Sequence, residues 1–190
     1  MTDRIAFQGE LGAYSHQACR DARPDMEALP CHTFEEVIEA VRSGAAKLAM
    51  LPVENTTYGR VADIHRLLPE SGLRIIDEAF VRVHISLMAL PGTRLDELEK
   101  VRAHLVLIPQ AASFLEKYGI KGEAYADSAG AAAELSRTRD RTTGVLASDL
   151  AAEIYGLEIL ARHIEDHAHN TTRFLIMAPQ ADLTRRGEHC

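Results

Sequence analysis

Short runs of apolar residues alternate along the chain with segments whose apolar residues recur every three or four positions. The short runs predict buried strands, and the segments of helical period predict amphipathic helices between them. We expect strands over residues 4–7, 47–53, 73–76, 80–90, 103–108, 123–126, 143–147 and 174–178. Strands that alternate with helices are typical of an α/β fold with mostly parallel sheets.

The segment 80–90 alternates between apolar and polar positions, which predicts a strand with one face less buried than the other. We expect the chain to cross there from a first lobe to a second one. The predicted division puts residues 1–77 and 165–180 in lobe 1 and residues 78–164 in lobe 2. Residues 181–190 are expected to form a disordered tail.

Polar segments follow several predicted strands, and one precedes the last strand. They are residues 8–15, 54–59, 109–110 and 170–173. In α/β proteins, ligands bind outside the carboxyl ends of the parallel strands. We therefore expect these segments to converge on one crevice between the lobes. The first of them is a glycine-containing turn from a strand into a helix, and the backbone N–H groups of such a turn suit an anion.

Thr172 stands at the start of the last predicted strand and is the main candidate for chemistry. A buried strand seldom opens on two hydroxyls and a guanidinium unless those groups are used. Because side chains alternate along a strand, Thr172 and Arg173 should face opposite sides. Arg173 is expected either to pair with Glu54 or Glu165 or to bind a carboxylate directly.

Asn55, Gln110 and Ser15 are further candidates for contact with a ligand. Asn55 and Gln110 carry amides that can donate or accept a hydrogen bond, although turn or helix-end structure would also explain them. Ser15 either caps the helix that it opens or touches a ligand.

The histidines do not predict a metal site. His163 and His167 could clamp an ion if they lay on a helix, but no second pair of ligands supports zinc. His16 and His104 could donate protons, although a structural role explains each of them equally simply. The sequence contains neither a nucleophile elbow nor a dinucleotide-binding fingerprint, so we predict neither a metal nor a cofactor.

The composition excludes several classes of function. The 190 residues carry a formal net charge of −7 and no cluster of basic residues, which argues against a nucleic-acid surface. No apolar stretch is as long as a membrane span, and the first residues lack the hydrophobic region of a signal peptide. The three cysteines show no CxxC spacing, so we expect a reducing, cytoplasmic setting.

Five segments, in order, resemble the motifs of the prephenate dehydratase family. Residues 9–18 resemble Gly-Pro-x-Gly-Thr-Phe-Ser-His-x-Ala, and residues 52–61 are similar to Pro-x-Glu-Asn-Ser/Thr-x-x-Gly-x-Val. Residues 127–132 resemble Asp-Thr-Ala-Gly-Ala-Ala, residues 147–157 a further block, and residues 170–174 the Thr-Arg-Phe signature. Together these motifs cover the length of a catalytic domain.

The resemblance implies a fold similar to that of type 2 periplasmic binding proteins, with the active site between the lobes. It implies that prephenate loses water and carbon dioxide to give phenylpyruvate, in phenylalanine biosynthesis, without a cofactor. The only partner it implies is this small-molecule substrate, and a homodimer is the one assembly left open. It assigns the key hydroxyl to Thr172. The substrate-binding residues that it implies are Ser15, Asn55, Thr56, Gln110, Thr171, Arg173 and Phe174.

Two departures from the family pattern affect this expectation. Ala103 stands where the family has a serine, so one hydroxyl contact is expected to be missing. The sequence also stops before the family's C-terminal ACT regulatory domain, so either the enzyme is unregulated or the sequence is truncated. The alternatives are an arogenate dehydratase, which does the same chemistry on the aminated substrate, and a non-catalytic two-lobed carboxylate-binding or sensor module.

Overall fold

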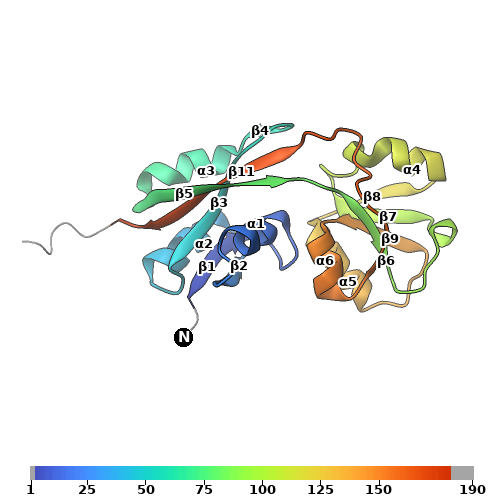
Figure 1. Ribbon diagram of the computed structural model, residues 1–190, viewed down its shortest axis with the longest axis horizontal. Helices are drawn as coiled ribbons and strands as arrows, with labels where there is room; N and C mark the ends of the chain where they lie inside the picture. The colour runs from blue at the N-terminus through green and yellow to red at the C-terminus, as the bar shows by residue number, and fades with distance from the viewer. Residues whose placement is uncertain (1–2, 181–190) are drawn as a thin grey trace, which may run out of the picture.

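The structure is a computed structural model that describes residues 3–180, and it has two lobes side by side (Figure 1). Lobe 1 is built on β1 (Arg4–Gln8), α1 (Tyr14–Ala22), β2 (Glu27–Cys31), α2 (Phe34–Arg42), β3 (Leu48–Asn55), β4 (Gly59–Arg60), α3 (Ala62–Leu67), β5 (Leu73–Arg82) and β11 (Thr171–Pro179). Lobe 2 is built on β6 (Ser86–Ala89), β7 (Lys100–His104), α4 (Ala112–Tyr118), β8 (Lys121–Tyr125), α5 (Ser128–Ser136), β9 (Thr143–Ala147), α6 (Asp149–Tyr155) and β10 (Glu158–Ala161). Three short 3₁₀ turns complete the path, at Leu68–Glu70, Leu95–Glu97 and Pro109–Ala111.

The two sheets have the same design. The main path in lobe 1 runs β2-β1-β3-β11-β5, and the path in lobe 2, taken from the opposite edge, runs β8-β7-β9-β6-β10. In each sheet the fourth strand pairs antiparallel with both neighbours, so the other four strands point the same way. The reversed strand is the one that arrives from the other lobe. The predicted α/β fold with mostly parallel sheets is therefore confirmed.

The chain crosses between the lobes twice. The first crossing joins β5 to β6 through residues 83–85, and the second joins β10 to β11 through residues 162–170 (Figure 1). The single strand expected over residues 80–90 is thus two strands, one in each sheet. The expected lobe limits at 77/78 and 164/165 stay predictions, since sheet membership alone follows β5 to Arg82. The expected disorder of residues 181–190 lies outside the described residues.

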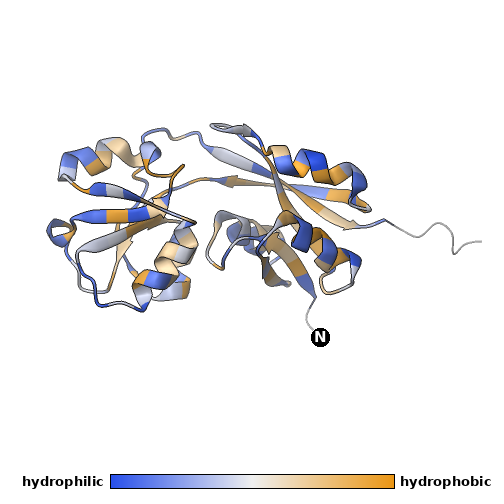
Figure 2. Ribbon diagram, turned by 180° about the vertical axis from the view of Figure 1, so that it is seen from behind, coloured by the Kyte–Doolittle hydropathy of each residue, from blue (hydrophilic) through white to orange (hydrophobic). Residues whose placement is uncertain are grey.

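Apolar side chains fill both faces of each sheet. In lobe 1, one core packs α2 and α3 against the sheet and a second packs α1 against the other face. In lobe 2, α4 covers one face, and α5 and α6 cover the other. Figure 2 shows the result, most clearly in lobe 1: hydrophobic stretches run along the strands, and the outer helices alternate between hydrophobic and hydrophilic residues. This burial on both faces explains why most strands appear in the sequence as continuous apolar runs.

The helix ends follow local signals in the sequence. The Thr33 hydroxyl accepts a hydrogen bond from Glu36 N at 3.1 Å, and Asp127 and Ser148 cap α5 and α6 in the same way. Gly119 and Gly156 end α4 and α6 in the left-handed conformation that glycine adopts without strain. The Asp127 and Ser148 caps fix where α5 and α6 begin, at the end of the lobe 2 sheet that faces lobe 1.

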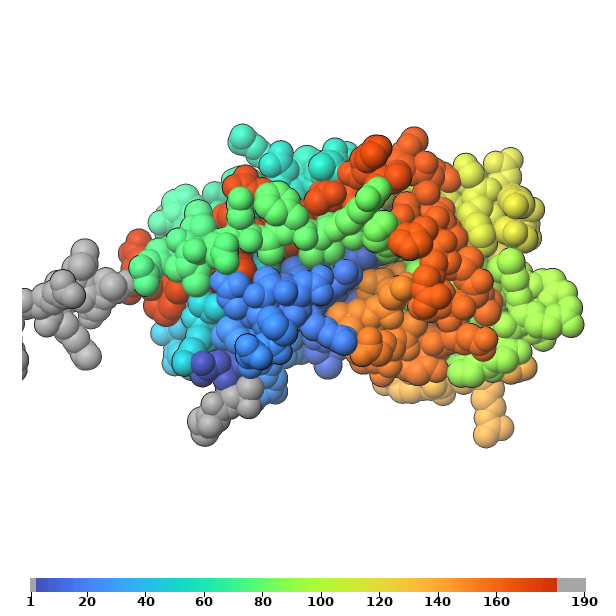
Figure 3. All heavy atoms as spheres, viewed as in Figure 1, coloured from blue at the N-terminus to red at the C-terminus, as the bar shows by residue number. Residues whose placement is uncertain are grey.

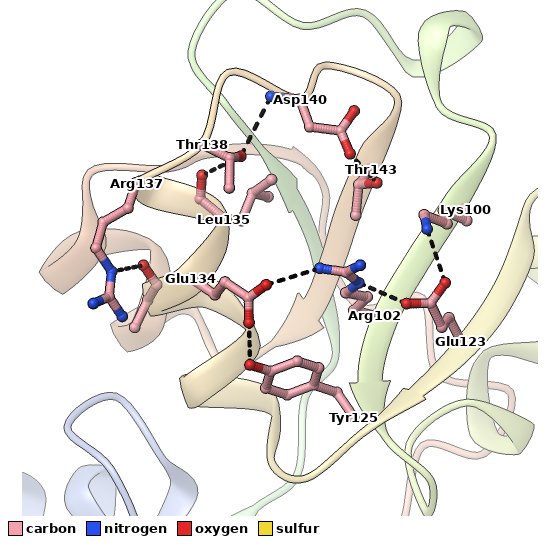
Figure 4. Close-up of polar contacts among 11 residues, drawn as sticks. Lys100, Arg102, Glu123, Tyr125, Glu134, Leu135, Arg137, Thr138, Asp140 and Thr143 are labelled. Carbon is pink, nitrogen blue, oxygen red and sulfur yellow. Dashed lines mark hydrogen bonds and ion pairs between the residues drawn. The ribbon is translucent and has the colours of Figure 1, made fainter.

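A network of charged side chains holds α5 against β7 and β8 (Figure 4). Arg102 on β7 donates to Glu123 on β8 at 2.7 Å and to Glu134 on α5 at 3.2 Å. Tyr125 also donates to Glu134, and hydrogen bonds to Arg102 and Lys100 lower the pKa of Glu123. The network thus joins the C-terminal half of α5, through Glu134, to both strands.

Candidate active site

The carboxyl ends of the parallel strands in the two lobes face one another across a cavity of about 300 Å³. On the lobe 1 side, the cavity is lined by the end of β1 and the turn after it. On the lobe 2 side, it is lined by residues at the carboxyl ends of β7, β8 and β9. A cavity at this position and of this size fits a small-molecule ligand. The lining residues are Gln8, Gly9, Glu10, Gly12, Ala13, Tyr14, Ser15, His104, Val106, Leu107, Ala126, Asp127, Ser128, Ala129, Ala147 and Ser148.

The turn from β1 into α1 forms the lobe 1 side of the cavity. His16 Nδ1 accepts a hydrogen bond from Gly12 N at 2.9 Å, and its ring stacks on Phe7. Burial and the nearby Arg20 lower the pKa of His16, in keeping with a neutral imidazole whose Nδ1 is an acceptor. His16 therefore shapes the turn, which is the structural role that its position in the sequence allowed.

Ser15 lies in the first turn of α1 and lines the cavity. The residue at the N-cap is Ala13, and no side chain caps the helix. Capping by Ser15, the alternative role considered from the sequence, does not occur. First-turn N–H groups of an α-helix have no partner within the helix, so α1 offers them to a ligand.

Lobe 2 presents capped helices to the same cavity. The Asp127 carboxylate accepts from Gly130 N at the start of α5, and Ser128 Oγ accepts a hydrogen bond from His104 N at 2.9 Å. His104 lines the cavity at the end of β7. The lobe 2 side thus combines a carboxylate with an imidazole, whereas the lobe 1 side combines the Glu10 carboxylate with the backbone N–H groups of the α1 N-terminus.

Contacts between the α1 turn and α6 hold the lobes together below the cavity. Ser148 Oγ donates to Gly12 O at 2.7 Å, and Tyr155 Oη donates to Leu11 O at 2.6 Å. Arg20 pairs with Glu153 at 3.1 Å across the same boundary. In the space-filling view the two segments touch, blue against orange (Figure 3).

A second polar group lies where β3 ends and β11 begins. Thr172 pairs with Asn55 in the ladder, and Asn55 Nδ2 donates to Thr172 Oγ1 at 2.9 Å. Thr172, Phe174 and Ile176 stand at every second position of β11 and therefore share one face of the sheet. Phe174 and Ile176 belong to the core on the α1 face. The hydroxyl therefore lies on the face of the sheet that carries α1, whose first turn lines the cavity.

Gln110 links the lobes through the second crossing. Its Nε2 donates to Val106 O at 2.7 Å and to Tyr58 Oη at 3.1 Å, and its Oε1 accepts from Asn170 Nδ2 at 2.8 Å. Tyr58 in turn donates to Val106 O at 2.6 Å. Both polar side-chain atoms of Gln110 thus have a protein partner, and Oε1 keeps a second lone pair that a ligand donor could use.

Thr56 and Thr171 belong to the same region, where the Thr56 hydroxyl and the Thr171 backbone N–H form hydrogen bonds within the protein. Thr56 Oγ1 donates to His169 O at 3.0 Å and accepts from Thr171 N at 2.9 Å. These bonds fasten the loop after β3 to the start of β11. Ser15 alone among the expected site residues lines the cavity, and the roles of the others in binding stay predictions.

Arg173 and Phe174 differ from the expectation. Arg173 pairs with Glu78 on β5 at 2.7 Å, and not with Glu54 or Glu165. Glu165 instead accepts a hydrogen bond from Ile85 N in the first crossing. Phe174 is 1% exposed and packs in the core of lobe 1. Phe174 is therefore a core residue and not part of the site that we propose.

Ala103 is completely buried in the core of lobe 2. Its methyl group does not line the cavity, and the expected loss of a hydroxyl contact stays a prediction. The next residue, His104, lines the cavity instead.

Tyr14, Asp127 and Ser128 line the cavity without having been predicted as site residues. Tyr14 lies in the polar segment 8–15 that was expected at the crevice, and Asp127 and Ser128 lie in the motif 127–132, so both signals pointed to these regions without singling out the residues. The histidines of the second crossing do not lie on a helix, so His163 and His167 do not share a helix face.

Among residues 3–180, no helix has the length and apolar character that a membrane span requires. A cavity between the facing strand ends of two α/β lobes defines a small-molecule binding protein. Residues 5–182 match the model of the prephenate dehydratase family, and this chain belongs to that family.

Similar proteins of the family carry several names. A protein of Komagataeibacter europaeus named bifunctional N-acyl-homoserine lactone acylase/prephenate dehydratase is 50% identical over 173 residues, which are 90% of this chain and 61% of that protein. Arogenate dehydratase 3 of Arabidopsis thaliana is 41% identical over 96% of this chain and 43% of its own length. This chain thus spans about half the length of the curated relatives that it matches.

Solved structures agree with the architecture. A quorum-quenching acylase named GqqA has a TM-score of 0.88 and 46% identity, over 94% of this chain and 64% of that one. A prephenate dehydratase from Arthrobacter aurescens, solved with L-Phe, has a TM-score of 0.85 and 26% identity, over 94% of this chain and 61% of that one.

Substituting Gly12 tests how tightly the lobes fit. Gly12 has φ +94°, and a methyl group there would lie 2.9 Å from Ala151 Cα across the lobe boundary. We expect Gly12→Ala to lower the free energy of unfolding and to increase the radius of gyration in small-angle scattering, since the lobes must move apart.

Gly119→Ala is the matched control, because Gly119 also has positive φ but nothing within 4 Å of the added methyl. It should lose only about 1–2 kcal/mol through backbone strain, with an unchanged radius of gyration. Equal behaviour of the two variants would show that Gly12 does not govern the lobe contact.

Proposed function

We propose that this chain converts prephenate to phenylpyruvate with loss of water and carbon dioxide. The observation that carries the proposal is the hydrogen bond from Asn55 Nδ2 to Thr172 Oγ1 at 2.9 Å. It occupies an acceptor site of the hydroxyl and leaves the Thr172 proton free to be donated to a ligand.

Backbone contacts fix the orientation of the Asn55 amide. Asn55 Oδ1 accepts hydrogen bonds from Thr57 N at 2.9 Å and from Tyr58 N at 3.0 Å. Because the oxygen is held by two donors, the amide nitrogen must face Thr172. Asn55 is thus a positioning residue that keeps the Thr172 hydroxyl a donor.

The reaction needs little beyond an orienting donor. As the C4–O bond of prephenate breaks, the leaving oxygen takes the electron pair and receives a proton, while the carboxylate leaves C1 as carbon dioxide and its electron pair completes the aromatic ring. Threonine has an ordinary hydroxyl and is a weak acid, so its contribution is a hydrogen bond or proton delivered in fixed geometry. Solvent then restores the proton to Thr172.

The two sides of the cavity differ in how they treat a carboxylate. The α1 N-terminus is uncapped by any side chain and has no acidic residue in its first turn, which favours an anion there, although Glu10 in the preceding turn also lines the cavity. The α5 N-terminus is capped by Asp127, which repels one. We propose that a substrate carboxylate binds at α1 beside Ser15, with Asn55 and Gln110 contributing toward the reacting end.

Two other substrates have specific support. Relatives at about 40% identity are named arogenate dehydratases, and arogenate differs from prephenate by an amino group in place of the keto group. The relative at 50% identity also bears the name of an N-acyl-homoserine lactone acylase. Apolar lining residues such as Val106 and Leu107 would suit an acyl chain. Amide hydrolysis by this chain is therefore the second candidate function.

We propose a cytoplasmic location, in agreement with the free thiols of Cys19 and Cys31. We also propose a homodimer. Strand β5 ends the lobe 1 sheet, and its apolar side chains Ile75 and Phe80 are 58% and 61% exposed. Exposed apolar side chains on an edge strand form a surface that a second copy can cover.

The homodimer is tested by sedimentation velocity. The wild-type protein should sediment as a dimer, and Phe80→Lys should convert it to a monomer by placing a charge on the covered edge. A monomeric wild-type protein would contradict the proposal.

An assay with three substrates tests the function. Purified protein is mixed separately with prephenate, arogenate and an N-acyl-homoserine lactone, and phenylpyruvate, phenylalanine and free homoserine lactone are measured. We expect turnover of prephenate to be the most efficient. Turnover of the lactone alone would favour the acylase, and turnover of none would favour a non-catalytic binding module.

Thr172→Ala should lower kcat by about 100- to 10,000-fold with little change in KM, because the lost hydrogen bond matters only as the oxygen leaves. Thr172→Ser retains the hydroxyl and should keep much of the activity. A wild-type kcat in Thr172→Ala would exclude the proposed role.

A further inference from the structure

The two crossings between the lobes bring together three side chains that are far apart in the sequence. His84 lies in the first crossing, and His163 and Glu165 lie in the second. His84 Nδ1 is 2.8 Å from Glu165 Oε1 and 2.8 Å from His163 Nδ1, and His163 Nδ1 is 3.7 Å from Glu165 Oε1. Two ring nitrogens and one carboxylate oxygen therefore converge on one point.

A single proton can link these atoms only if it is shared. A neutral His84 with its proton on Nδ1 can reach both Glu165 Oε1 and the lone pair of His163 Nδ1 only through a bifurcated hydrogen bond, which is weaker than two separate ones. With the proton on the other nitrogen of His84, the lone pairs of His84 Nδ1 and Glu165 Oε1 face one another. A positive charge at the centre resolves the conflict, and two imidazoles with a carboxylate form a donor set that transition metals favour.

Neighbouring groups hold the three ligands in place. Glu165 Oε2 accepts a hydrogen bond from Ile85 N at 2.9 Å, which leaves Oε1 free to face the histidines. Burial favours the neutral form of Glu165, but the bonds from Ile85 and His84 outweigh it, so the pKa of Glu165 is lowered and the group is a carboxylate at neutral pH. The backbone oxygen of His84 accepts from Tyr14 Oη at 2.7 Å.

His163 is held toward the cluster at a cost in backbone energy. Its φ of +53° is the one positive value at a residue other than glycine within residues 3–180. Such a conformation is strained for a residue with a side chain, and it is found at sites where the surrounding structure holds a side chain in one place. The side chains of His84 and His163 are 40% and 61% exposed, so solvent can supply an ion and further ligands.

We propose that His84, His163 and Glu165 bind a divalent transition metal ion, with zinc the best fit, and that the ion links the two crossings. Zinc at about 2.0–2.1 Å from each ligand needs separations of about 3.4 Å between ligand atoms, so the observed 2.8–3.7 Å requires only small shifts. Water would complete the coordination. Since both connections between the lobes meet at the ion, binding stiffens the hinge.

Calorimetric titration with zinc chloride, on protein first stripped with a chelator, tests the proposal. We expect the wild type to bind zinc, and His84→Ala and Glu165→Gln to lose affinity by at least about tenfold. The matched control is His167→Ala, an exposed histidine of the same segment outside the cluster, which should bind as the wild type does. Cobalt should give the strong visible absorption of a four-coordinate site in wild type and not in His84→Ala.

Thermal unfolding in the presence and absence of zinc provides the second readout. Zinc should raise the Tm of the wild type and of His167→Ala but not of Glu165→Gln, which keeps a side chain able to accept from Ile85 N. Failure of the wild type to bind zinc would overturn the proposal, as would unchanged affinity in both His84→Ala and Glu165→Gln. A loss in His167→Ala as large as that in His84→Ala would assign binding to the exposed histidines instead.

Discussion

The antiparallel ladder that seats β11 between β3 and β5 is the constraint on which the rest of the structure depends. It brings residues 117 positions apart into contact, so that Asn55 Nδ2 meets Thr172 Oγ1 at 2.9 Å. The same strand completes the sheet of lobe 1 and ends the second crossing between the lobes. The position of the proposed reactive hydroxyl is thus set by a buried strand, and not by a mobile loop.

The lobes share a strand order, but their helices meet the cavity differently. Lobe 1 offers a helix without a side-chain cap, and lobe 2 offers helices whose N-termini are occupied by Asp127 and Ser148. On the proposed binding mode, the first turn of α1 is where a carboxylate would bind, and this would orient an elongated dicarboxylate in the cleft. The contacts of Gly12 with α6 decide how closely the two walls approach.

Local signals in the sequence predicted much of this fold. Caps such as Thr33 and Asp127, and helix ends such as Gly119, act within one turn, so these signals can be read without tertiary information. Strand β2 was missed because it is a half-exposed edge strand that contains Pro30, and β10 because it is only four residues long. The positions of Thr172 and Asn55 at strand ends made them candidates, and the family resemblance implies the same two residues. Contacts across the fold were out of reach, among them the pairing of Arg173 with Glu78 and the meeting of His84 with Glu165.

A crystal structure of the protein with an unreactive prephenate analogue that retains the C4 hydroxyl tests the central claim most directly. The account predicts the C4 oxygen within hydrogen-bonding distance of Thr172 Oγ1, with Asn55 Nδ2 still donating to that hydroxyl and a carboxylate at the first turn of α1. An analogue bound in the cavity with its C4 oxygen far from Thr172 would contradict the account.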